Sequence, residues 1–184
     1  MAYNKIGSES IDFGNQDVRA YSISLNGTGV TSSAAELNIM DGVTATAAEI
    51  NQACDTDVRA VVITTTKAVS AAESGSIFFI DNATGFVSTL PAPAIGLRYT
   101  FINKTANTSG NHTIVTTSSA NIIKGNQNSV AGDAGDSGTA DDTISFVANQ
   151  SVAGDKVELY SDGTSWFAYA ISRVAAGITF TQAS

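Results

Sequence analysis

A thirteen-residue unit occurs twice in tandem in this chain, first at residues 30–42 and again at residues 43–55. In each copy a hydroxyl residue precedes a glutamate by three positions. The two pairs are Ser33 with Glu36, and Thr46 with Glu49. This spacing is the capping box, in which the hydroxyl accepts a bond from the helix backbone and the glutamate bonds back to the cap residue. The repeat therefore predicts two short helices that begin at Ser33 and Thr46.

Each predicted helix is too short to be stable by itself. A helix of about eight residues is roughly 12 Å long, and isolated helices of this length do not persist in water. The apolar side of the repeats, which includes Leu37, Met40 and Ile50, therefore needs a partner. Because the unit is repeated, we expect the partner to be the same segment of another copy of the chain, joined through these three side chains.

Residues 1–29 have the pattern of an extended arm. Tyr21, Ile23 and Leu25 alternate with polar residues, which is the period of a strand with one buried face. The following glycines, Gly27 and Gly29, indicate a stop without a hairpin. We expect the arm to lie on the surface of another protein. The contacts are assigned to four apolar residues, Phe13, Tyr21, Ile23 and Leu25.

The rest of the chain, residues 57–184, alternates short apolar runs with turn residues, which predicts a β-rich domain. Clear alternation occurs around Leu97, around Ile144, and from Val157 through a turn at Asp162 to Ala170. Residues 77–80 and 86–90 flank a turn and predict a hairpin. Residues 125–142 are rich in Gly, Asp, Ser and Asn, and predict a long loop. Residues 178–181 predict a final strand.

Composition limits the classes of function. The 184 residues carry a formal net charge of -8, which opposes binding to nucleic acids and acidic membranes because such binding depends on basic side chains. No apolar run approaches the roughly 20 residues of a membrane span, and the first residues lack a signal peptide, so we expect synthesis in the cytoplasm. The single cysteine, Cys54, predicts a small buried residue rather than a reactive thiol.

The sequence predicts no catalytic, metal or cofactor site. His112 is the only histidine, and no nucleophile motif stands near it, so we interpret it as a turn or strand-start residue. Four acidic residues, Asp133, Asp136, Asp141 and Asp142, match no calcium loop, which favours a solvated turn. Four aromatic residues near the end of the chain favour core packing over a sugar-stacking platform. They are Tyr160, Trp166, Phe167 and Tyr169.

The stretch from Ser33 to Asn51 resembles the AAELNxLDGVTATAAELN repeats of tailed-bacteriophage virion proteins, found in tail fibres, head fibres and capsid decoration proteins. The later runs 86–92, 96–101 and 159–166 are similar to the β domains that accompany such repeats. The resemblance implies a homotrimeric, non-enzymatic structural protein on the outer surface of the virion. The size of the chain, 184 residues, favours a decoration or cement protein, which binds the major capsid protein and stabilises the head.

The resemblance and the patterns together predict three parts. Residues 1–29 form a capsid-binding arm, residues 30–56 form the helical trimerisation segment, and residues 57–184 form an antiparallel β-sandwich or jelly-roll-like knob. The alternative is a tail or head fibre protein whose knob binds a receptor or a host-surface glycan. A virion-associated enzyme that cleaves glycans is a third interpretation. Nucleic acid and membrane are not expected as partners, and no cofactor is expected.

Overall fold

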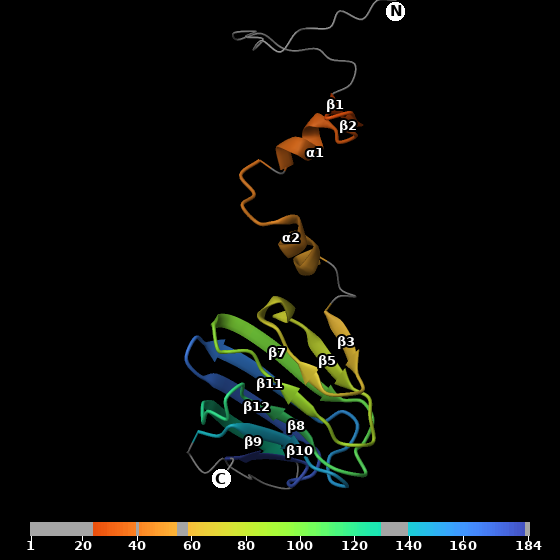
Figure 1. Cartoon of the computed structure of the whole chain (residues 1–184). Helices are drawn as coiled ribbons and strands as arrows, with labels where there is room; N and C mark the ends of the chain where they lie inside the picture. Colours follow the sequence, from red (N-terminus) through yellow and green to blue (C-terminus); the bar gives the residue numbers. More distant parts are fainter. Residues whose placement is uncertain (1–23, 40, 55–58, 130–139, 183–184) are drawn as a thin grey trace, which may run out of the picture. The chain divides into compact units, whose positions relative to one another are not determined.

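The computed structural model describes residues 24–39, 41–54, 59–129 and 140–182 (Figure 1). The chain divides into two compact units, Met1–Ala45 and Thr46–Ser184. The described part of the chain is mainly β, as the alternating apolar pattern predicts. The expectations for Phe13, Tyr21, Ile23 and Met40 fall outside the described residues.

The first unit contains a small hairpin and one helix. Strand β1 (Ser24–Leu25) pairs antiparallel with β2 (Thr28–Gly29), and helix α1 spans Ala34–Ile39. The turn residues Asn26 and Gly27 have φ of 51° and 81°. Positive φ at both central residues is typical of a tight hairpin turn, and Asn-Gly is its strongest sequence signal. The interpretation of this segment as a strand without a hairpin was therefore wrong.

The second unit contains helix α2 (Ala47–Cys54), a 3₁₀ turn η1 (Ala71–Glu73) and two β-sheets. One sheet has six strands in the order β3-β5-β7-β11-β12-β9, and the other has five in the order β13-β10-β8-β6-β4. The strands of the six-stranded sheet are β3 (Ala60–Ile63), β5 (Ile77–Ile80), β7 (Ile95–Asn103), β9 (Ile123–Ser129), β11 (Lys156–Asp162) and β12 (Trp166–Ser172). The strands of the five-stranded sheet are β4 (Lys67–Ala68), β6 (Val87–Thr89), β8 (His112–Val115), β10 (Thr143–Phe146) and β13 (Ile178–Thr181).

From β3 to β8 the chain follows a coiled path. Consecutive strands belong to alternate sheets. Strands β3, β5 and β7 are parallel neighbours in one sheet (Figure 1). Strands β4, β6 and β8 are parallel neighbours in the other. The strands β10 to β13 add antiparallel pairs. Both sheets are therefore mixed, and the expectation of an antiparallel fold was wrong. Apolar alternation marks a strand but does not define the direction of its neighbour.

The predicted hairpin between residues 77–80 and 86–90 was also wrong, because β5 and β6 lie in different sheets. The residues between them carry the chain from one sheet to the other. Asp81 anchors this crossing, since it accepts hydrogen bonds from the Lys104 ammonium (2.6 Å) and the Thr105 hydroxyl (2.5 Å). Asn82 donates its side-chain amide to the Thr64 carbonyl over 2.6 Å.

Two strand predictions, the hairpin through Asp162 and the final strand, are confirmed. Strands β11 and β12 form an antiparallel hairpin, and in its turn the Asp162 carboxylate accepts the backbone N–H of Thr164 (2.8 Å) and of Ser165 (2.7 Å). Gly163 supplies the positive φ of 97° in the turn. The final segment, β13, pairs antiparallel with β10. These elements were predictable because alternation and turn chemistry agree in them.

Strand β9 departs from the predicted loop at 125–142. It includes Gly125, Asn126, Gln127 and Asn128, which are poor strand formers, and it pairs in parallel with β12. A Cβ on Gly125 would lie 2.4 Å from the ring of Phe180. The strand therefore depends on packing against distant residues rather than on local propensity.

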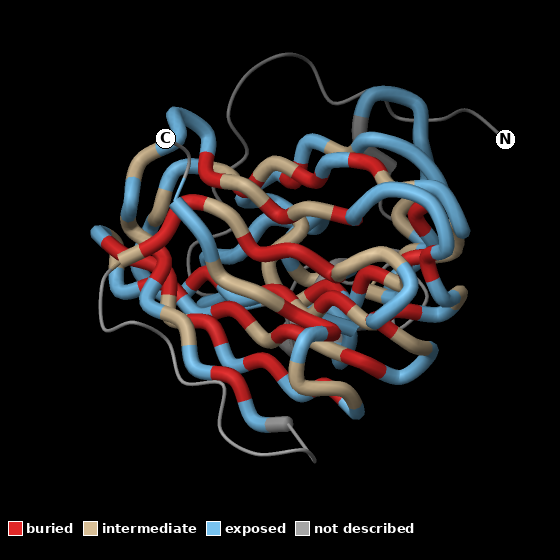
Figure 2. Tube along the Cα trace, turned by 90° about the horizontal axis from the view of Figure 1, so that it is seen from below, coloured by how far each residue is buried: buried red, intermediate tan, exposed pale blue. Residues whose placement is uncertain are grey.

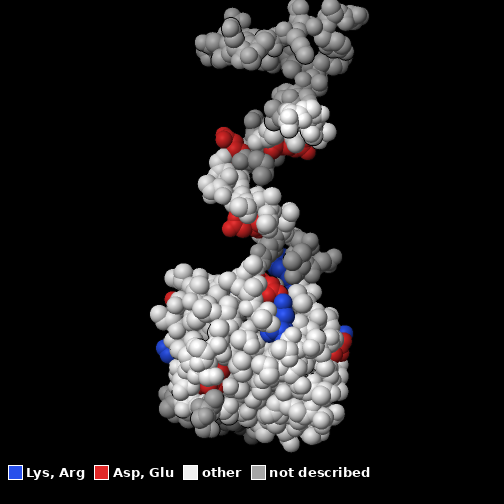
Figure 3. Space-filling view, viewed as in Figure 1, with Lys and Arg blue, Asp and Glu red and all other residues white. Residues whose placement is uncertain are grey.

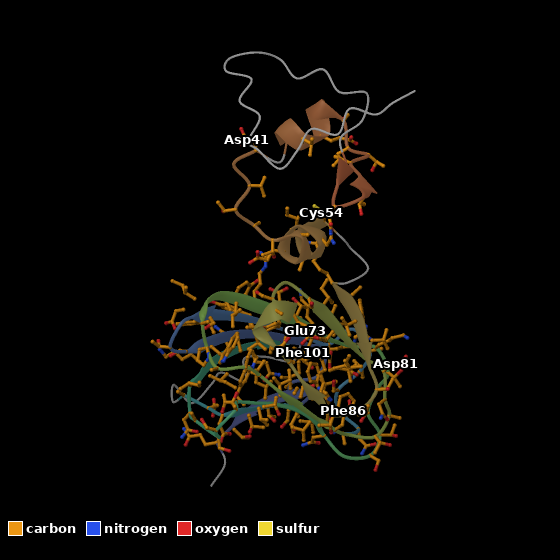
Figure 4. All side chains as sticks on the ribbon, turned by 45° about the horizontal axis from the view of Figure 1, so that its top comes forward. Asp41, Cys54, Glu73, Asp81, Phe86 and Phe101 are labelled. Atoms are coloured by element: carbon orange, nitrogen blue, oxygen red, sulfur yellow. The ribbon has the colours of Figure 1, made fainter. Side chains whose placement is uncertain are left out.

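The two sheets contribute their buried side chains to one hydrophobic cluster. Phe78, Phe101 and Leu159 from the six-stranded sheet, and Ile114 and Phe146 from the five-stranded sheet, are inaccessible to solvent. Figure 2 shows the resulting alternation of buried and more exposed residues along the strands. Figure 4 shows Phe86 and Phe101 within this unit, among densely packed side chains. Burial of each such side chain stabilises the folded state by about 1.5–3 kcal/mol.

Candidate functional site

The candidate site is the pair of helical repeats, and each repeat begins with a helix cap. In α1 the Ser33 backbone N–H and hydroxyl both donate to Glu36 Oε2, each over 2.7 Å. The Glu36 backbone N–H donates to Ser33 Oγ over 3.3 Å, and the Leu37 N–H donates to the Ser33 carbonyl over 3.0 Å. The cap therefore satisfies backbone donors that a helix start otherwise leaves without partners.

The second repeat has the same geometry. The Thr46 backbone N–H and hydroxyl donate to Glu49 Oε2 over 2.7 Å each, and the Glu49 N–H donates to Thr46 Oγ1 over 3.3 Å. The hydrogen bond from the Thr46 N–H, followed by that from its hydroxyl, lowers the pKa of Glu49 below its ordinary value. The Ser33 bonds lower the pKa of Glu36 in the same way. The ionised glutamates also suit the positive end of a helix.

A third capping box was missed by the sequence reasoning. The Ser70 backbone N–H and hydroxyl donate to Glu73 Oε2 over 2.8 and 2.9 Å, at the start of η1. The signal was present, because residues 70–73 repeat the tetrapeptide of residues 33–36. Here Gly75, with a φ of 91°, follows closely, and the element ends after one turn. Lys67 also pairs with Glu73 over 2.6 Å.

The apolar side chains of the repeats are partly accessible within a single chain. The Leu37 side chain is 48% exposed, and Val43, the first residue of the second repeat, is 43% exposed. Ile50 is half-buried. Cys54 is exposed at the end of α2, so the prediction of a small buried residue was wrong for the isolated chain. Figure 4 shows Cys54 on this helix and Asp41 in the link that follows α1.

Of the four arm residues, only Leu25 belongs to the described part of the chain. It lies in β1, where its backbone is paired with Thr28 of β2. The assignment of Phe13, Tyr21, Ile23 and Leu25 as capsid contacts therefore stays a prediction.

The single histidine of the chain, His112, is a core residue. His112 is the first residue of β8, as the strand-start interpretation predicts, and its ring lies edge-on to Phe86 at a centroid distance of 4.1 Å. Burial lowers the pKa of His112 to about 3, so the imidazole is neutral at physiological pH. Asp141 and Asp142 are also buried, and the expectation of a solvated turn was wrong for these two residues. Asp133 and Asp136 lie outside the described residues.

The four aromatic residues do not share one environment. Trp166 is fully buried and Phe167 is half-buried, whereas Tyr160 is 44% exposed and Tyr169 is 52% exposed. The core prediction was therefore right for Trp166 and wrong for the two tyrosines. Their rings meet edge to face at a centroid distance of 6.2 Å on the outward face of the six-stranded sheet. Tyr160 also lines a shallow hollow of about 230 Å³ with Arg98 and Glu158.

The described residues contain acidic side chains and short helices. Among them, His, Cys, Asp and Glu side chains form no group of three or more that could hold a metal ion. None of the described helices combines the length and the apolar character needed to cross a membrane.

Comparisons with protein-family models, curated proteins and solved structures find no match for this chain.

Proposed function

We propose that this chain is a structural protein of a tailed-bacteriophage virion. In this proposal it is a homotrimeric decoration, or cement, protein that is made in the host cytoplasm, binds the outer surface of the head and stabilises it. Its role is non-enzymatic, and its partners are other copies of itself and the major capsid protein. The net charge of -8 disfavours nucleic acid and acidic membranes as partners.

The observation that carries the proposal is the pair of identically capped helices. The repeats have the same three cap distances, 2.7, 2.7 and 3.3 Å, yet α1 has only six residues and α2 only eight. Helices this short gain most of their stability from packing of an apolar side. In α1 that side includes Leu37, which is 48% exposed in one chain. Association of three copies through Leu37, Met40 and Ile50 would bury these side chains.

The β-rich unit supports a knob outside the shell. Its surface in the view of Figure 3 is largely uncharged, with charged side chains in a few small groups. Side chains of both sheets form its core, a single hydrophobic cluster. This arrangement suits a sandwich or jelly-roll-like fold with mixed sheets. Residues 1–29 would then serve as the arm that adds to an exposed surface of the capsid protein.

The direct test is binding to undecorated heads. The intact protein should sediment with heads that lack it, saturate at hundreds of copies per particle and raise the temperature at which they rupture. A variant without residues 1–29 should stay a folded trimer and remain in the supernatant. Saturation at a few tens of copies or fewer would contradict decoration. Undiminished binding by the truncated protein would move the capsid contact to the helices or the knob.

The second candidate is a tail or head fibre protein with a knob that binds a receptor or a glycan. The exposed tyrosines Tyr160 and Tyr169 favour it, since exposed aromatic rings are typical of binding surfaces. The number of copies in a purified particle separates the two candidates, because a fibre is present in a handful or a few tens of copies.

A further inference from the structure

The outward face of the six-stranded sheet differs from the rest of the β-rich unit. Six of the nine large hydrophobic side chains that are exposed in the described residues belong to strands of this sheet, whereas only Val87 belongs to the five-stranded sheet. The six are Val62, Ile77, Ile95, Tyr160, Tyr169 and Ile171. The five-stranded sheet has instead polar positions such as Thr113, Thr143 and Thr179 that are half-buried. Exposed aromatic and aliphatic groups gathered on one face are typical of a binding surface.

The strand registers place polar and aromatic residues of this face side by side. Tyr160 of β11 lies opposite Arg98 of β7, and two positions earlier Glu158 lies between Thr100 of β7 and Tyr169 of β12. Neighbouring strands are about 4.8 Å apart, so these side chains emerge within one small area. This area contains the hollow of about 230 Å³ noted above, whose wall includes Arg98, Thr100, Glu158 and Tyr160.

The hollow carries a positive charge at its edge although the chain as a whole is acidic. The Glu158 carboxylate accepts hydrogen bonds from Lys156 Nζ over 2.8 Å and from the Tyr160 hydroxyl over 3.3 Å. The Lys156 hydrogen bond is the main cause of the lowered pKa of Glu158. None of the salt bridges between described residues involves the Arg98 guanidinium. Arg98 and Lys156 against Glu158 leave one net positive charge, and its source is Arg98.

A glycine lies beside Arg98. Gly75 has a φ of 91°, its N–H donates to the Arg98 carbonyl over 2.8 Å, and a Cβ on it would come within 4.0 Å of Arg98 Nε. A side chain at position 75 would therefore stand beside the guanidinium. The planar fork of an arginine can bind a carboxylate through two parallel hydrogen bonds.

We propose that this hollow binds one pyranose ring that carries a carboxylate, as in a uronate residue of an acidic polysaccharide. The exposed Tyr160 ring offers an apolar face for the C–H groups of the sugar. Arg98 binds the carboxylate, and Glu158 and Thr100 accept hydrogen bonds from ring hydroxyls. The hollow is smaller than the 300–1,000 Å³ of sites for drug-sized ligands, which suits a single ring. This inference does not depend on the capsid role proposed above.

The test compares two probes that differ only in the carboxylate, methyl glucuronide and methyl glucoside. Each is titrated into the isotopically labelled full-length protein while backbone amide signals are recorded by NMR. The glucuronide should shift signals of residues 98–100 and 158–160 and bind about tenfold more tightly than the glucoside, as expected for one charge-assisted contact. Equal binding of the two probes, or no shift at these residues, would overturn the proposal.

Variants assign the roles. Arg98→Gln should abolish the preference for the glucuronide, and Tyr160→Ala should abolish binding of both probes. The matched control is Arg173→Gln, because Arg173 is exposed but does not line this hollow, and it should keep the full preference. If Tyr160→Ala instead lowers the particle mass in light scattering without any sugar present, the face is a contact between copies of the chain and the sugar site is refuted. Capsid binding by the sugar-binding variants reports separately on the decoration proposal.

Discussion

Gly85 lies directly against the backbone of Asn111, so that a Cβ on Gly85 would stand 2.2 Å from the Asn111 carbonyl oxygen. The two residues belong to two crossings from the six-stranded to the five-stranded sheet, Gly85 to the one before β6 and Asn111 to the one before β8. The Gly85 N–H donates to the Ser109 carbonyl over 2.7 Å, which fixes the two crossings together. The coiled path from β3 to β8 therefore has room for a hydrogen atom, but not for a methyl group, at this position.

Replacing Gly85 by Ala should reduce the free energy of unfolding by about 1–3 kcal/mol, because the obstacle is backbone rather than a movable side chain. The matched control is Gly96→Ala. Gly96 has a φ of 84° but open space around it, so alanine there costs only backbone strain of about 1–2 kcal/mol. Urea unfolding of both variants measures the difference. A Gly85 variant as stable as the intact protein would contradict the close contact.

In the folded protein, His112 should remain neutral at pH values far below its ordinary pKa. Because burial lowers the pKa of His112 from 6.5 to about 3, the unfolded chain takes up a proton first as the pH falls. The stabilising effect of the neutral ring is complete above pH 6.5 and is lost between pH 6.5 and 3, at about 1.4 kcal/mol per pH unit. The chain has one histidine, so its NMR signal is unambiguous.

Two measurements check this prediction. The imidazole signal of His112 should not move between pH 7 and pH 5 in the folded protein, and His112→Gln should remove this part of the pH dependence of unfolding. Titration of the folded-state signal near pH 6.5 would show that the ring is accessible.

The helix caps should weaken in acid. The pKa of Glu36 and of Glu49 is lowered by hydrogen bonds from the cap residues, first from the backbone and then from the hydroxyl. Their contribution to helix stability is present above the ordinary value of 4.5 and is lost as the pH falls through the lowered pKa. Carboxyl ¹³C titrations should give midpoints below 4.5 for both glutamates.

Each cap can serve as the internal control when the other is mutated. Ser33→Ala should move the midpoint of Glu36 upward and reduce the helical Cα shifts of α1, while Glu49 and α2 stay unchanged. Midpoints at the ordinary value in the intact protein would mean that the reciprocal bonds are not made in solution.

The trimer proposal predicts that Leu37→Asp combined with Ile50→Asp yields monomers or aggregates in light scattering. Each apolar side chain buried between copies would contribute about 1.5–3 kcal/mol, repeated in every chain of a symmetric assembly. The control variant carries the same added charge at other positions of the same helices. Ala35→Asp with Asn51→Asp meets this requirement, since both residues are exposed. A trimer of unchanged thermal stability in the first variant would contradict the proposed contact.

Sequence patterns predicted most strands of the β-rich unit but not their connections. Leu97, Tyr99 and Phe101 alternate with polar residues because one face of β7 packs in the core, and that requirement is visible in the sequence. The directions of its two neighbours, parallel for β5 and antiparallel for β11, are not visible in the sequence pattern. The pairing of β9 depends on the room that Gly125 gives to the Phe180 ring, which no local pattern expresses.

The candidate site was predictable where the interactions are local. Ser33 and Glu36 are three residues apart, so their mutual bonds follow from spacing alone. The hairpin at Asn26 and Gly27 was predictable as well, although we interpreted Gly27 and Gly29 as a stop. The hollow beside Tyr160 was not predictable, because it forms where three strands distant in sequence meet.

Each thirteen-residue unit contains all the hydrogen bonds of its own cap within four consecutive residues. Inserting or removing one unit therefore changes the length of chain between Leu25 and Ala60 by thirteen residues and breaks no bond in the other cap. Duplication of the unit would therefore lengthen the chain before the β-rich unit in fixed steps of thirteen residues, each of which contains its own complete helix start.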